Sequence, residues 1–334
     1  MTGVGLWVKK IPFPPSATGG SFSHCYKVKS TDGKEAFLKA LDYSRALRSG
    51  DPAAELQKLT AAYIFERDIL ELCNNKGLDR VVRAIKSGNV TVSCGGSSEV
   101  VQYLIFEKAD CDVRSQLADA TKINLSWKLK CLHNIATGLG QLHSIEIAHQ
   151  DVKPSNVLVF DNKISKIADL GRAAHKRIVA PHDHYSFAGD PSYSPPEGLY
   201  NFIQPDWIYR RMGCDCYLLG SMVTFFFTGF SATALLLKNL DKQHHWLNWN
   251  GTFDQVLPFL RESYRLVILE CEASIPNEKL RIEIIKLIKE LCEPDPRIRG
   301  DKSQRNKFGS PFATERYISR FNTLAYQSEA GFFA

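Results

Sequence analysis

The most constraining feature of this sequence is a pair of short polar stretches that a compact hairpin would bring together. The first runs from His149 to Asn156, and the second is Asp169-Leu170-Gly171. Between them, two apolar runs, 157–160 and 164–168, flank an Asp-Asn turn signal. Two strands that are joined by a tight turn hold their outer ends side by side. We therefore expect the two polar stretches to meet at one edge of a strand–turn–strand unit.

The side chains that would meet at this edge suit the chemistry of phosphate transfer. Asp151 and Asp169 supply carboxylates, and Asn156 supplies an amide oxygen. Lys153 adds an ammonium group. Magnesium prefers hard oxygen ligands, and a lysine can offset the negative charge of a transferring phosphoryl group. These residues therefore predict a site that holds magnesium and a phosphate group.

The same residues resemble the catalytic loop and the metal-binding motif of the protein kinases. The resemblance is to the bacterial and eukaryotic-like Ser/Thr protein kinases, and it covers about residues 16–299. It implies that Asp151 orients the proton of the attacking hydroxyl and that Lys153 neutralises the transferring group. It also implies that Asn156 and Asp169 hold the metal. A lysine two residues after Asp151 implies serine or threonine acceptors.

Further matches upstream imply a nucleotide site. Lys39 lies in an expected strand, 34–41, that follows an Asp-Gly turn. Its expected partner is Glu66, on a helix that the apolar periodicity predicts over residues 56–73. In the kinase template, such a pair orients the lysine on the phosphates of ATP. Gly20 is the one glycine kept in the stretch that resembles the glycine-rich loop, where close backbone approach to phosphate favours glycine.

The adenine of ATP is expected at a joint between two lobes. A strand is expected over residues 100–106, and the resemblance places the joint directly after it. Backbone groups of Glu107 and Ala109 would read the adenine edge, and Phe106 would guard the rear of the pocket. The implied ligands are therefore ATP and Mg²⁺, with Mn²⁺ as a substitute metal.

Three residues farther along the chain are implied to support the site. Glu197 ends the stretch Pro195-Pro196-Glu197, which resembles the substrate-docking segment of the kinases, and it would pair with Arg299. Asp215 begins an expected buried helix and would anchor the backbone of the catalytic loop. Small-molecule kinases of the aminoglycoside type generally lack both the docking segment and a lysine equivalent to Lys153.

Two residues depart from the family pattern. Gln150 replaces the arginine that usually precedes the catalytic aspartate and normally receives a phosphate on the activation segment. We therefore expect activity that does not depend on phosphorylation of that segment. Asp190 stands where the family usually carries a threonine. Its carboxylate could pair with Lys153 or repel Asp151, and the sequence leaves both alternatives open.

The order of these patterns predicts an α+β, two-lobed, protein-kinase-like fold. A chain of 334 residues with 44% hydrophobic residues can bury a large core. Strand-like runs characterise residues 1–108, the expected N-terminal lobe. Long helical patterns characterise residues 109–334, the expected C-terminal lobe. Ser126 and Asn277 are expected to cap two of its helices.

Composition and spacing argue against several other classes of protein. A net charge of +6 without a dense basic block does not indicate a nucleic-acid partner. Nine cysteines without a C-x-x-C pair predict a reduced, cytoplasmic protein. Residues 216–237 carry no charge, but Gly229 interrupts them, so we expect a buried helix rather than a membrane span. Without a third ligand nearby, His182, His184 and the pair His244-His245 are expected at the surface.

The sequence thus favours an ATP- and magnesium-dependent Ser/Thr protein kinase that acts on protein substrates. A small-molecule phosphotransferase on the same fold is one alternative. A pseudokinase that serves as a binding or scaffold protein is the other, and the altered glycine-rich loop, Gln150 and Asp190 motivate it. The retention of six matching residues argues against a pseudokinase: Lys39, Glu66, Asp151, Lys153, Asn156 and Asp169.

Overall fold

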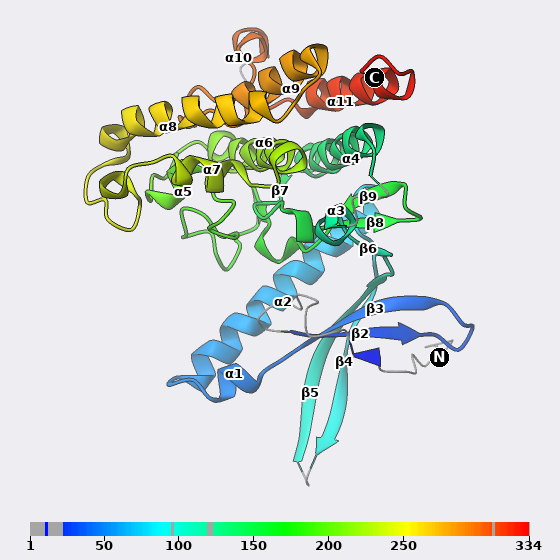
Figure 1. The fold of residues 1–334 in the computed structure, drawn as a ribbon. Helices are drawn as coiled ribbons and strands as arrows, with labels where there is room; N and C mark the ends of the chain where they lie inside the picture. The colour runs from blue at the N-terminus through cyan, green and yellow to red at the C-terminus, as the bar shows by residue number, and fades with distance from the viewer. Residues whose placement is uncertain (1–10, 13–22, 95–96, 119–122, 309–310, 334) are drawn as a thin grey trace.

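Two lobes, one built on a β-sheet and a larger one built of helices, are stacked on each other (Figure 1). The computed structural model describes residues 11–12, 23–94, 97–118, 123–308 and 311–333. The predicted two-lobed α+β fold is confirmed, because strands make up most of the small lobe and helices most of the large one.

The small lobe is a five-stranded antiparallel sheet with the strand order β1-β2-β3-β5-β4. Its strands are β1 (Ile11–Pro12), β2 (Ser23–Lys29), β3 (Glu35–Leu41), β4 (Ala84–Cys94) and β5 (Ser97–Glu107). Gly33 has a φ of +87° in the turn between β2 and β3, a conformation that glycine adopts without steric cost. Lys39 pairs with Cys25 on one side and Leu104 on the other, which places it in the interior of the sheet.

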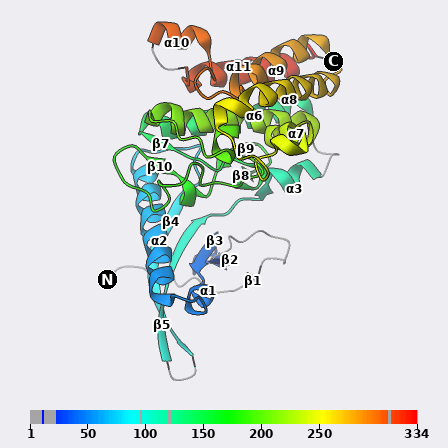
Figure 2. The same cartoon turned by 90° about the vertical axis from the view of Figure 1, so that its left-hand side faces the viewer.

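One long helix, α2 (Pro52–Asn75), runs from the sheet towards the large lobe (Figures 1 and 2). A short helix, α1 (Ser44–Leu47), precedes it. The Asp51 side chain accepts a hydrogen bond from the Ala54 backbone N–H and caps the start of α2. The buried face of α2 consists of Tyr63, Phe65, Glu66, Ile69, Leu70 and Cys73. Glu66 is the charged member of this face, so the helix carries a carboxylate into the protein interior.

The predicted hairpin after the catalytic-loop motif is present. Its strands are β8 (Val157–Phe160) and β9 (Ile164–Ile167). The turn residues Asp161 and Asn162 have φ angles of 50° and 52°, a region that Asp and Asn enter more readily than most other residues. Beyond the strands, the Ala168 N–H donates to the Asn156 carbonyl at 2.8 Å. The two polar stretches therefore leave the hairpin side by side, as the sequence predicts.

The large lobe is organised around α6 (Gly213–Thr228), most of whose residues are buried. Helices α4, α7, α8 and α9 all contact it. The other helices are α3 (Val113–Ala118), α4 (Leu125–Ser144), α5 (Pro196–Leu199), α7 (Ala232–Lys238), α8 (Phe253–Ala273), α9 (Glu278–Leu291), α10 (Lys302–Phe308) and α11 (Thr314–Glu329). Short strands complete the lobe: β6 (Cys111–Asp112) beside β8, and β7 (Ile147–Ala148) paired with β10 (Ala174–His175).

One of the two predicted helix caps is wrong. Asn124, rather than Ser126, caps α4, because its side-chain oxygen accepts from the Trp127 N–H at 2.8 Å. Ser126 lies inside the first turn, where its backbone is already helical. Asn277 caps α9 as predicted and accepts from the Leu280 N–H at 3.0 Å.

The uncharged stretch 216–237 is divided between two helices. Gly229 ends α6 with a φ of +81°, and the Ser231 side chain caps α7. Within the described residues, no single helix is long and apolar enough to cross a membrane. One pair, 208–228 with 232–238, would pass on length and composition, and it is bent by 75°.

The contact between α6 and α9 predicts a destabilising substitution at Gly220. A Cβ at this position would lie 2.4 Å from Cys292 Sγ and 2.7 Å from Leu291 Cβ. Because overpacking a core typically costs about 1–3 kcal/mol, we expect Gly220→Ala to lower the free energy of unfolding by about that amount in a denaturant titration. Gly50→Ala is the matched control, since its Cβ would meet nothing within 4 Å. Equal stability of the two variants would contradict the packing argument.

Candidate active site

A cavity of about 480 Å³ lies between the lobes and is lined by predicted site residues from both. Lys39 and Glu66 come from the small lobe, and Asn156 and Asp169 come from the large lobe. Apolar side chains line the same cavity, among them Ala36, Phe106 and Leu158. A cavity of this size with apolar walls and a few convergent charged groups is typical of small-ligand sites. The predicted contact at Gly20 lies outside the described residues.

Three predicted residues meet inside this cavity. Lys39 Nζ donates to Glu66 Oε1 at 2.9 Å and to Oε2 at 3.0 Å. It also lies 3.4 Å from Asp169 Oδ1. β3 carries Lys39 and α2 carries Glu66, whereas Asp169 follows β9 with a left-handed φ of 62°. The structure therefore brings together residues that are up to 130 positions apart in the sequence.

The neighbouring charges determine the ionisation of these groups. Burial disfavours the charge on Lys39, but the carboxylates of Asp169 and Glu66 outweigh burial and raise the pKa of Lys39. Lys39 in turn lowers the pKa of Asp169. At Glu66 burial dominates and raises its pKa in spite of the lysine. Lys39 is thus held as a cation and Asp169 as an anion at neutral pH.

Asp151 is held in one orientation by groups from two segments. Its Oδ2 accepts from Asn156 Nδ2 at 2.9 Å and lies 3.2 Å from Lys153 Nζ. Its Oδ1 accepts from the backbone N–H of Asp190 at 2.8 Å. Burial raises the pKa of Asp151, although the Lys153 charge opposes this effect. A fixed, buried carboxylate with a raised pKa is a candidate for a general base.

Asp190 forms an ion pair with Lys153, one of the two alternatives that the sequence left open. Its Oδ2 lies 3.3 Å from Lys153 Nζ. Its Oδ1 accepts from the N–H and the hydroxyl of Ser192 at 3.0 and 2.7 Å. Burial acts to raise the pKa of Asp190, but the Ser192 hydrogen bonds and Lys153 hold it below its usual value. The group of Asp190 that contacts Asp151 is the backbone N–H rather than the carboxylate.

Asp215 holds the backbone of the catalytic loop. It is fully buried in the first turn of α6. Its Oδ2 accepts from the His149 N–H at 2.7 Å, and its Oδ1 accepts from the Gln150 N–H at 2.8 Å. His143 Nε2 lies 2.9 Å from Oδ2 and adds a third partner. Gln150 has a φ of 66°, which is uncommon for a residue other than glycine, and the bonds to Asp215 stabilise this conformation.

His149 also orients the loop, a role that was not predicted from the sequence. Its Nε2 lies 2.9 Å from the Ala168 carbonyl, and its Nδ1 lies 3.2 Å from the Asp151 backbone nitrogen. Because a carbonyl only accepts and a backbone N–H only donates, the ring carries its proton on Nε2 and accepts at Nδ1. The buried ring therefore links the catalytic loop to the residue before Asp169. Its place two residues before Asp151 was the signal available in the sequence.

The joint between the lobes begins at Glu107, the last residue of β5. Its carboxylate accepts from Lys166 Nζ at 2.7 and 2.9 Å and from the Arg83 N–H at 2.8 Å. Glu107, Ala109 and Phe106 all line the cavity. The side chain of Glu107 is bonded elsewhere and its backbone N–H donates to the Arg83 carbonyl at 3.1 Å, so contact with a ligand would fall to its backbone carbonyl. Lys166, which orients Glu107, is a further residue that the sequence did not indicate.

Asn156 and Asp169 fit a metal ion that is completed by phosphate oxygens. The Asn156 amide nitrogen donates to the carbonyl and to the Oδ2 of Asp151, each at 2.9 Å, so its amide oxygen is the group left to bind a cation. The Asp169 side chain is 46% exposed beside Lys39. Within the described residues no three His, Cys, Asp or Glu side chains cluster as metal ligands. Magnesium commonly takes one or two protein ligands together with phosphate and water, which these two residues match.

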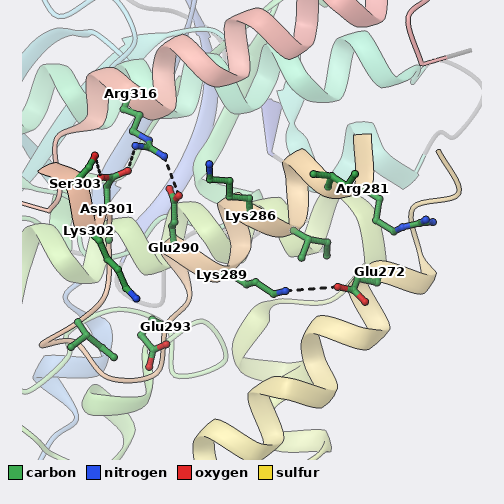
Figure 3. Close-up of a pocket in the computed structure, with 14 residues that line it drawn as sticks. Glu272, Arg281, Lys286, Lys289, Glu290, Glu293, Asp301, Lys302, Ser303 and Arg316 are labelled. Carbon is green, nitrogen blue, oxygen red and sulfur yellow. Dashed lines mark hydrogen bonds and ion pairs between the residues drawn. The ribbon is translucent and has the colours of Figure 1, made fainter. Parts of the chain in front are cut away.

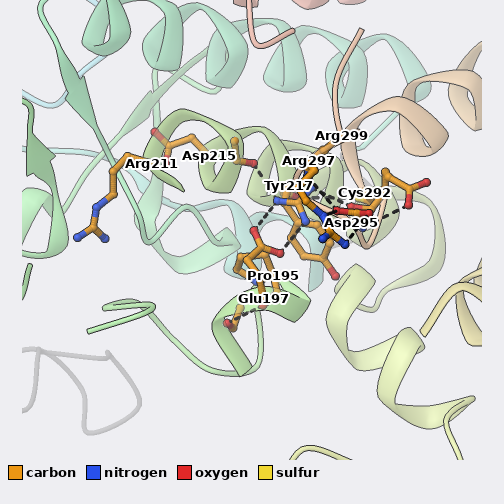
Figure 4. Close-up of polar contacts among 12 residues, drawn as sticks. Pro195, Glu197, Arg211, Asp215, Tyr217, Cys292, Asp295, Arg297 and Arg299 are labelled. Carbon is orange, nitrogen blue, oxygen red and sulfur yellow. Dashed lines mark hydrogen bonds and ion pairs between the residues drawn. The ribbon is translucent and has the colours of Figure 1, made fainter. Parts of the chain in front are cut away.

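Glu197 and Arg299 form a buried bidentate ion pair (Figure 4). The two terminal nitrogens of Arg299 donate to the two carboxylate oxygens of Glu197 at 2.6 and 2.7 Å. Arg299 also donates to the carbonyls of Glu293 and Gly213 at 2.9 and 3.2 Å. The pair ties the predicted docking segment to the core of the large lobe.

A larger hollow of about 770 Å³ lies among α8, α9, α10 and α11 (Figure 3). Several of its charged side chains are paired with one another. Arg316 contacts Glu290 and Asp301, and Lys289 lies 3.9 Å from Glu272. The residues that line this hollow include none of the predicted site residues that the structure describes. The cavity between the lobes is therefore the candidate active site.

Two of the histidines expected at the surface are buried. His182 is 4% exposed and His244 is 8% exposed. His244 stacks on Phe259 with 3.6 Å between ring centroids, and His182 Nε2 lies 2.9 Å from the Ala173 carbonyl. The prediction was wrong because the packing of these rings depends on segments that are distant in the sequence.

The Glu197–Arg299 pair generates a prediction about stability. We expect Arg299→Met to lower the free energy of unfolding by about 3–5 kcal/mol, because Glu197 would remain buried without a cation. A denaturant titration measures this change. The double variant Glu197→Leu/Arg299→Met leaves no unpaired charge, so it should recover part of the loss. A single variant at least as stable as the double variant would contradict this account.

Comparison with known proteins shows the family. Residues 18–306 match the family model described as the protein kinase domain. The chain is 33% identical over 105 residues to the serine/threonine-protein kinase PTK2/STK2 of Saccharomyces cerevisiae. This match covers 27% of this chain and 12% of the yeast protein. It is 30% identical over 211 residues to human cyclin-dependent kinase-like 2. This match covers 58% of this chain and 40% of the human protein.

A third relative extends the match along the chain. The brassinosteroid LRR receptor kinase BRI1 of Oryza sativa is 26% identical over 268 residues, which covers 75% of this chain and 21% of the rice protein. The chain thus matches less than half the length of each of these relatives. Because the family model spans most of the chain and the two-lobed fold agrees with it, this chain belongs to the eukaryotic-like protein kinase family.

Proposed function

We propose that this protein is an ATP- and magnesium-dependent kinase that phosphorylates serine and threonine hydroxyls of proteins. The observation that carries the proposal is the convergence of Lys39, Asn156 and Asp169 on one cavity, with Asp151 hydrogen-bonded directly to Asn156. Such an arrangement provides groups for phosphate, metal and acceptor within a single site.

ATP is the phosphate donor that the cavity suits. Apolar walls and the backbone at residues 107–109 suit an adenine ring, and Lys39 suits its phosphates. Asn156 and Asp169 would hold magnesium, which neutralises charge on the phosphate oxygens when it is bound with the nucleotide. The protein's own contribution is to hold these groups in place, since phosphoryl transfer depends mainly on positioning and charge.

Asp151 is suited to accept the proton of the acceptor hydroxyl. In the proposed step the hydroxyl oxygen bonds to the terminal phosphorus of ATP, the bond to the bridging oxygen breaks, and ADP leaves. Burial disfavours the charge of Lys153, but Asp151 and Asp190 outweigh burial and raise its pKa. Lys153 therefore stays positive and would stabilise the charge on the transferring group.

Two features favour protein acceptors over small metabolites. The pair Glu197–Arg299 fixes the docking segment, and hydroxyls of Ser231 and Thr233 donate to the carbonyls of Ser192 and Ser194 at 2.7 and 2.8 Å. Residues 192–197, beside the catalytic loop, are therefore held in a fixed conformation on which a polypeptide can dock. The position of Lys153 and the printed name of the yeast relative support serine and threonine as acceptors.

We extend the proposal to a reducing, cytoplasmic location. Buried cysteines such as Cys73, Cys131 and Cys292 are reduced thiols, which is compatible with that location. A pseudokinase or a small-molecule phosphotransferase remains the competing function, and a transfer assay separates all three. A pseudokinase transfers no phosphate, whereas a metabolite kinase labels small molecules but no protein.

Substitution of Asp151 tests the proposed base. We expect Asp151→Asn to lower phosphate transfer from radiolabelled ATP to protein by about 10²–10⁴-fold, the range that removal of a general base usually gives. Asp161→Asn is the matched control, because Asp161 lies in the exposed β8–β9 turn and asparagine also tolerates its positive φ. Equal labelling by the native chain and Asp151→Asn would contradict the assignment.

The ionisation of Asp151 makes turnover depend on pH. Asp151 must be ionised to accept a proton, so turnover should fall as the pH drops through its raised pKa. Lys153 holds this pKa down, and Lys153→Met should therefore move the acid limb of the kcat profile to higher pH while also lowering kcat. Lys163→Met, in the exposed turn, should leave the profile unchanged. An acid limb that stays in place in Lys153→Met would rule out this coupling.

A further inference from the structure

The guanidinium of Arg211 lies buried between the catalytic loop and the activation segment, which comprises residues 172–197. Arg211 is 1% exposed and has one of the largest fully buried side chains among the described residues. It belongs to a π-helical turn, η4 (Ile208–Met212), that leads directly into α6 (Figure 4 shows Arg211 and Asp215). Such turns are rare and are frequently found at functional sites.

Arg211 contacts both segments at once. Its Nη2 donates to the carboxylate of Asp183 at 3.0 Å and to the Asp183 carbonyl at 3.2 Å. Its Nη1 donates to the side-chain oxygen of Gln150 at 3.3 Å. A guanidinium can bridge such acceptors because it is planar and carries five donors.

Gln150 passes this connection on to the catalytic loop. Its Nε2 donates to the Arg211 carbonyl at 2.8 Å and to Asp215 Oδ1 at 3.1 Å. A continuous chain of hydrogen bonds therefore runs from Asp183 through Arg211 and Gln150 to Asp215. Asp215 also accepts from the backbone N–H of Gln150, which directly precedes Asp151, so the chain of hydrogen bonds reaches the residue next to the candidate base.

The turn that contains Asp183 is attached to other parts of the site as well. Arg210 donates to the carbonyls of Asp183 and Tyr185, each at 2.8 Å. The buried His182 lies with Nε2 at 3.0 Å from the Arg172 carbonyl, just after the metal motif, and its ring meets that of Phe65 edge to face. Phe65 precedes Glu66 on α2. One short turn thus contacts Arg210 and Arg211, the residues directly after the metal motif, and the helix that supplies the partner of Lys39.

We propose that Arg211 is a positioning residue that couples the activation segment to the catalytic loop, and that Asp183 supplies the negative charge it needs. The inference rests on the proposed kinase function and adds a structural basis for activity without a phosphate on the activation segment. In this arrangement a carboxylate of the chain itself binds the guanidinium. Gln150 carries no charge and links Arg211 to Asp215 by hydrogen bonds. Arg211 is therefore the cation that binds the activation segment.

The test compares three variants with the native chain after phosphatase treatment, and mass spectrometry verifies that the chain is unphosphorylated. We expect Asp183→Asn to lower kcat about tenfold, which corresponds to a modest loss of positioning energy, with the KM for ATP nearly unchanged. Asp183→Glu restores the charge and should recover most of the activity. Arg211→Lys should behave like Asp183→Asn, because an ammonium group lacks the planar fork that reaches both segments.

Arg177→Gln is the matched control. Arg177 lies in the same segment, and its ion pair with Glu146 is exposed and separate from the chain of bonds to Gln150. We expect this variant to have native kinetics. Hydrogen exchange gives a second readout that does not require activity. Backbone amides of residues 180–190 and 149–151 should exchange faster in Asp183→Asn than in the native chain or in Arg177→Gln.

The possible outcomes separate this inference from the proposed function. A native chain that is active without phosphate, and an Asp183→Asn variant with the same kcat and the same exchange, would overturn the role of Arg211 while leaving the kinase assignment intact. A native chain that becomes active only after phosphorylation of the segment would overturn the inference and support the kinase. A native chain as inactive as Asp151→Asn under all conditions would overturn the proposed function. If hydrogen exchange in Asp183→Asn were then also unchanged, the coupling of the activation segment to the catalytic loop through Arg211 would be overturned as well.

Discussion

The rest of the site depends on the buried carboxylate of Asp215. A carboxylate without water needs hydrogen-bond donors, and here the donors are the backbone N–H groups of His149 and Gln150, with His143 and the Gln150 side chain beside them. Satisfying this one charge therefore fixes the path of the catalytic loop, including the left-handed φ of Gln150. Because α6 is the central and mostly buried helix of the large lobe, these bonds hold the loop in a fixed position relative to the core.

The site contains two lysines, each of which lies between two carboxylates. Lys39 lies between Glu66 and Asp169, and Lys153 lies between Asp151 and Asp190. In each case two carboxylates raise the pKa of the lysine and keep it positive in spite of burial. The first group serves the nucleotide side of the proposed reaction and the second serves the acceptor side. Asp190 changes the second group, because it adds a carboxylate where the family usually has a hydroxyl.

Local patterns predicted the parts of the fold whose contacts are short in sequence. The Asp-Gly and Asp-Asn turns fall where positive φ angles occur, and the β8–β9 hairpin between the catalytic loop and the metal motif is as expected. The Lys39–Glu66 pair was predicted from a helix periodicity and a family resemblance together, and the structure places the two groups 2.9 Å apart. The cap of α4 was missed because Asn124 and Ser126 are both good capping residues, and only the backbone angles distinguish them.

What the sequence by itself determined is the order of the elements and the identity of the chemical groups, because hydrophobic periodicity, turn residues and motif spacing are local properties. The tertiary structure decided which distant groups share a partner. His182 and Asp183 form an ordinary polar stretch in the sequence, yet one is buried against Phe65 and the other binds Arg211. Burial and pairing of charges depend on segments that meet only after folding, since a guanidinium loses its water only when packed elements enclose it.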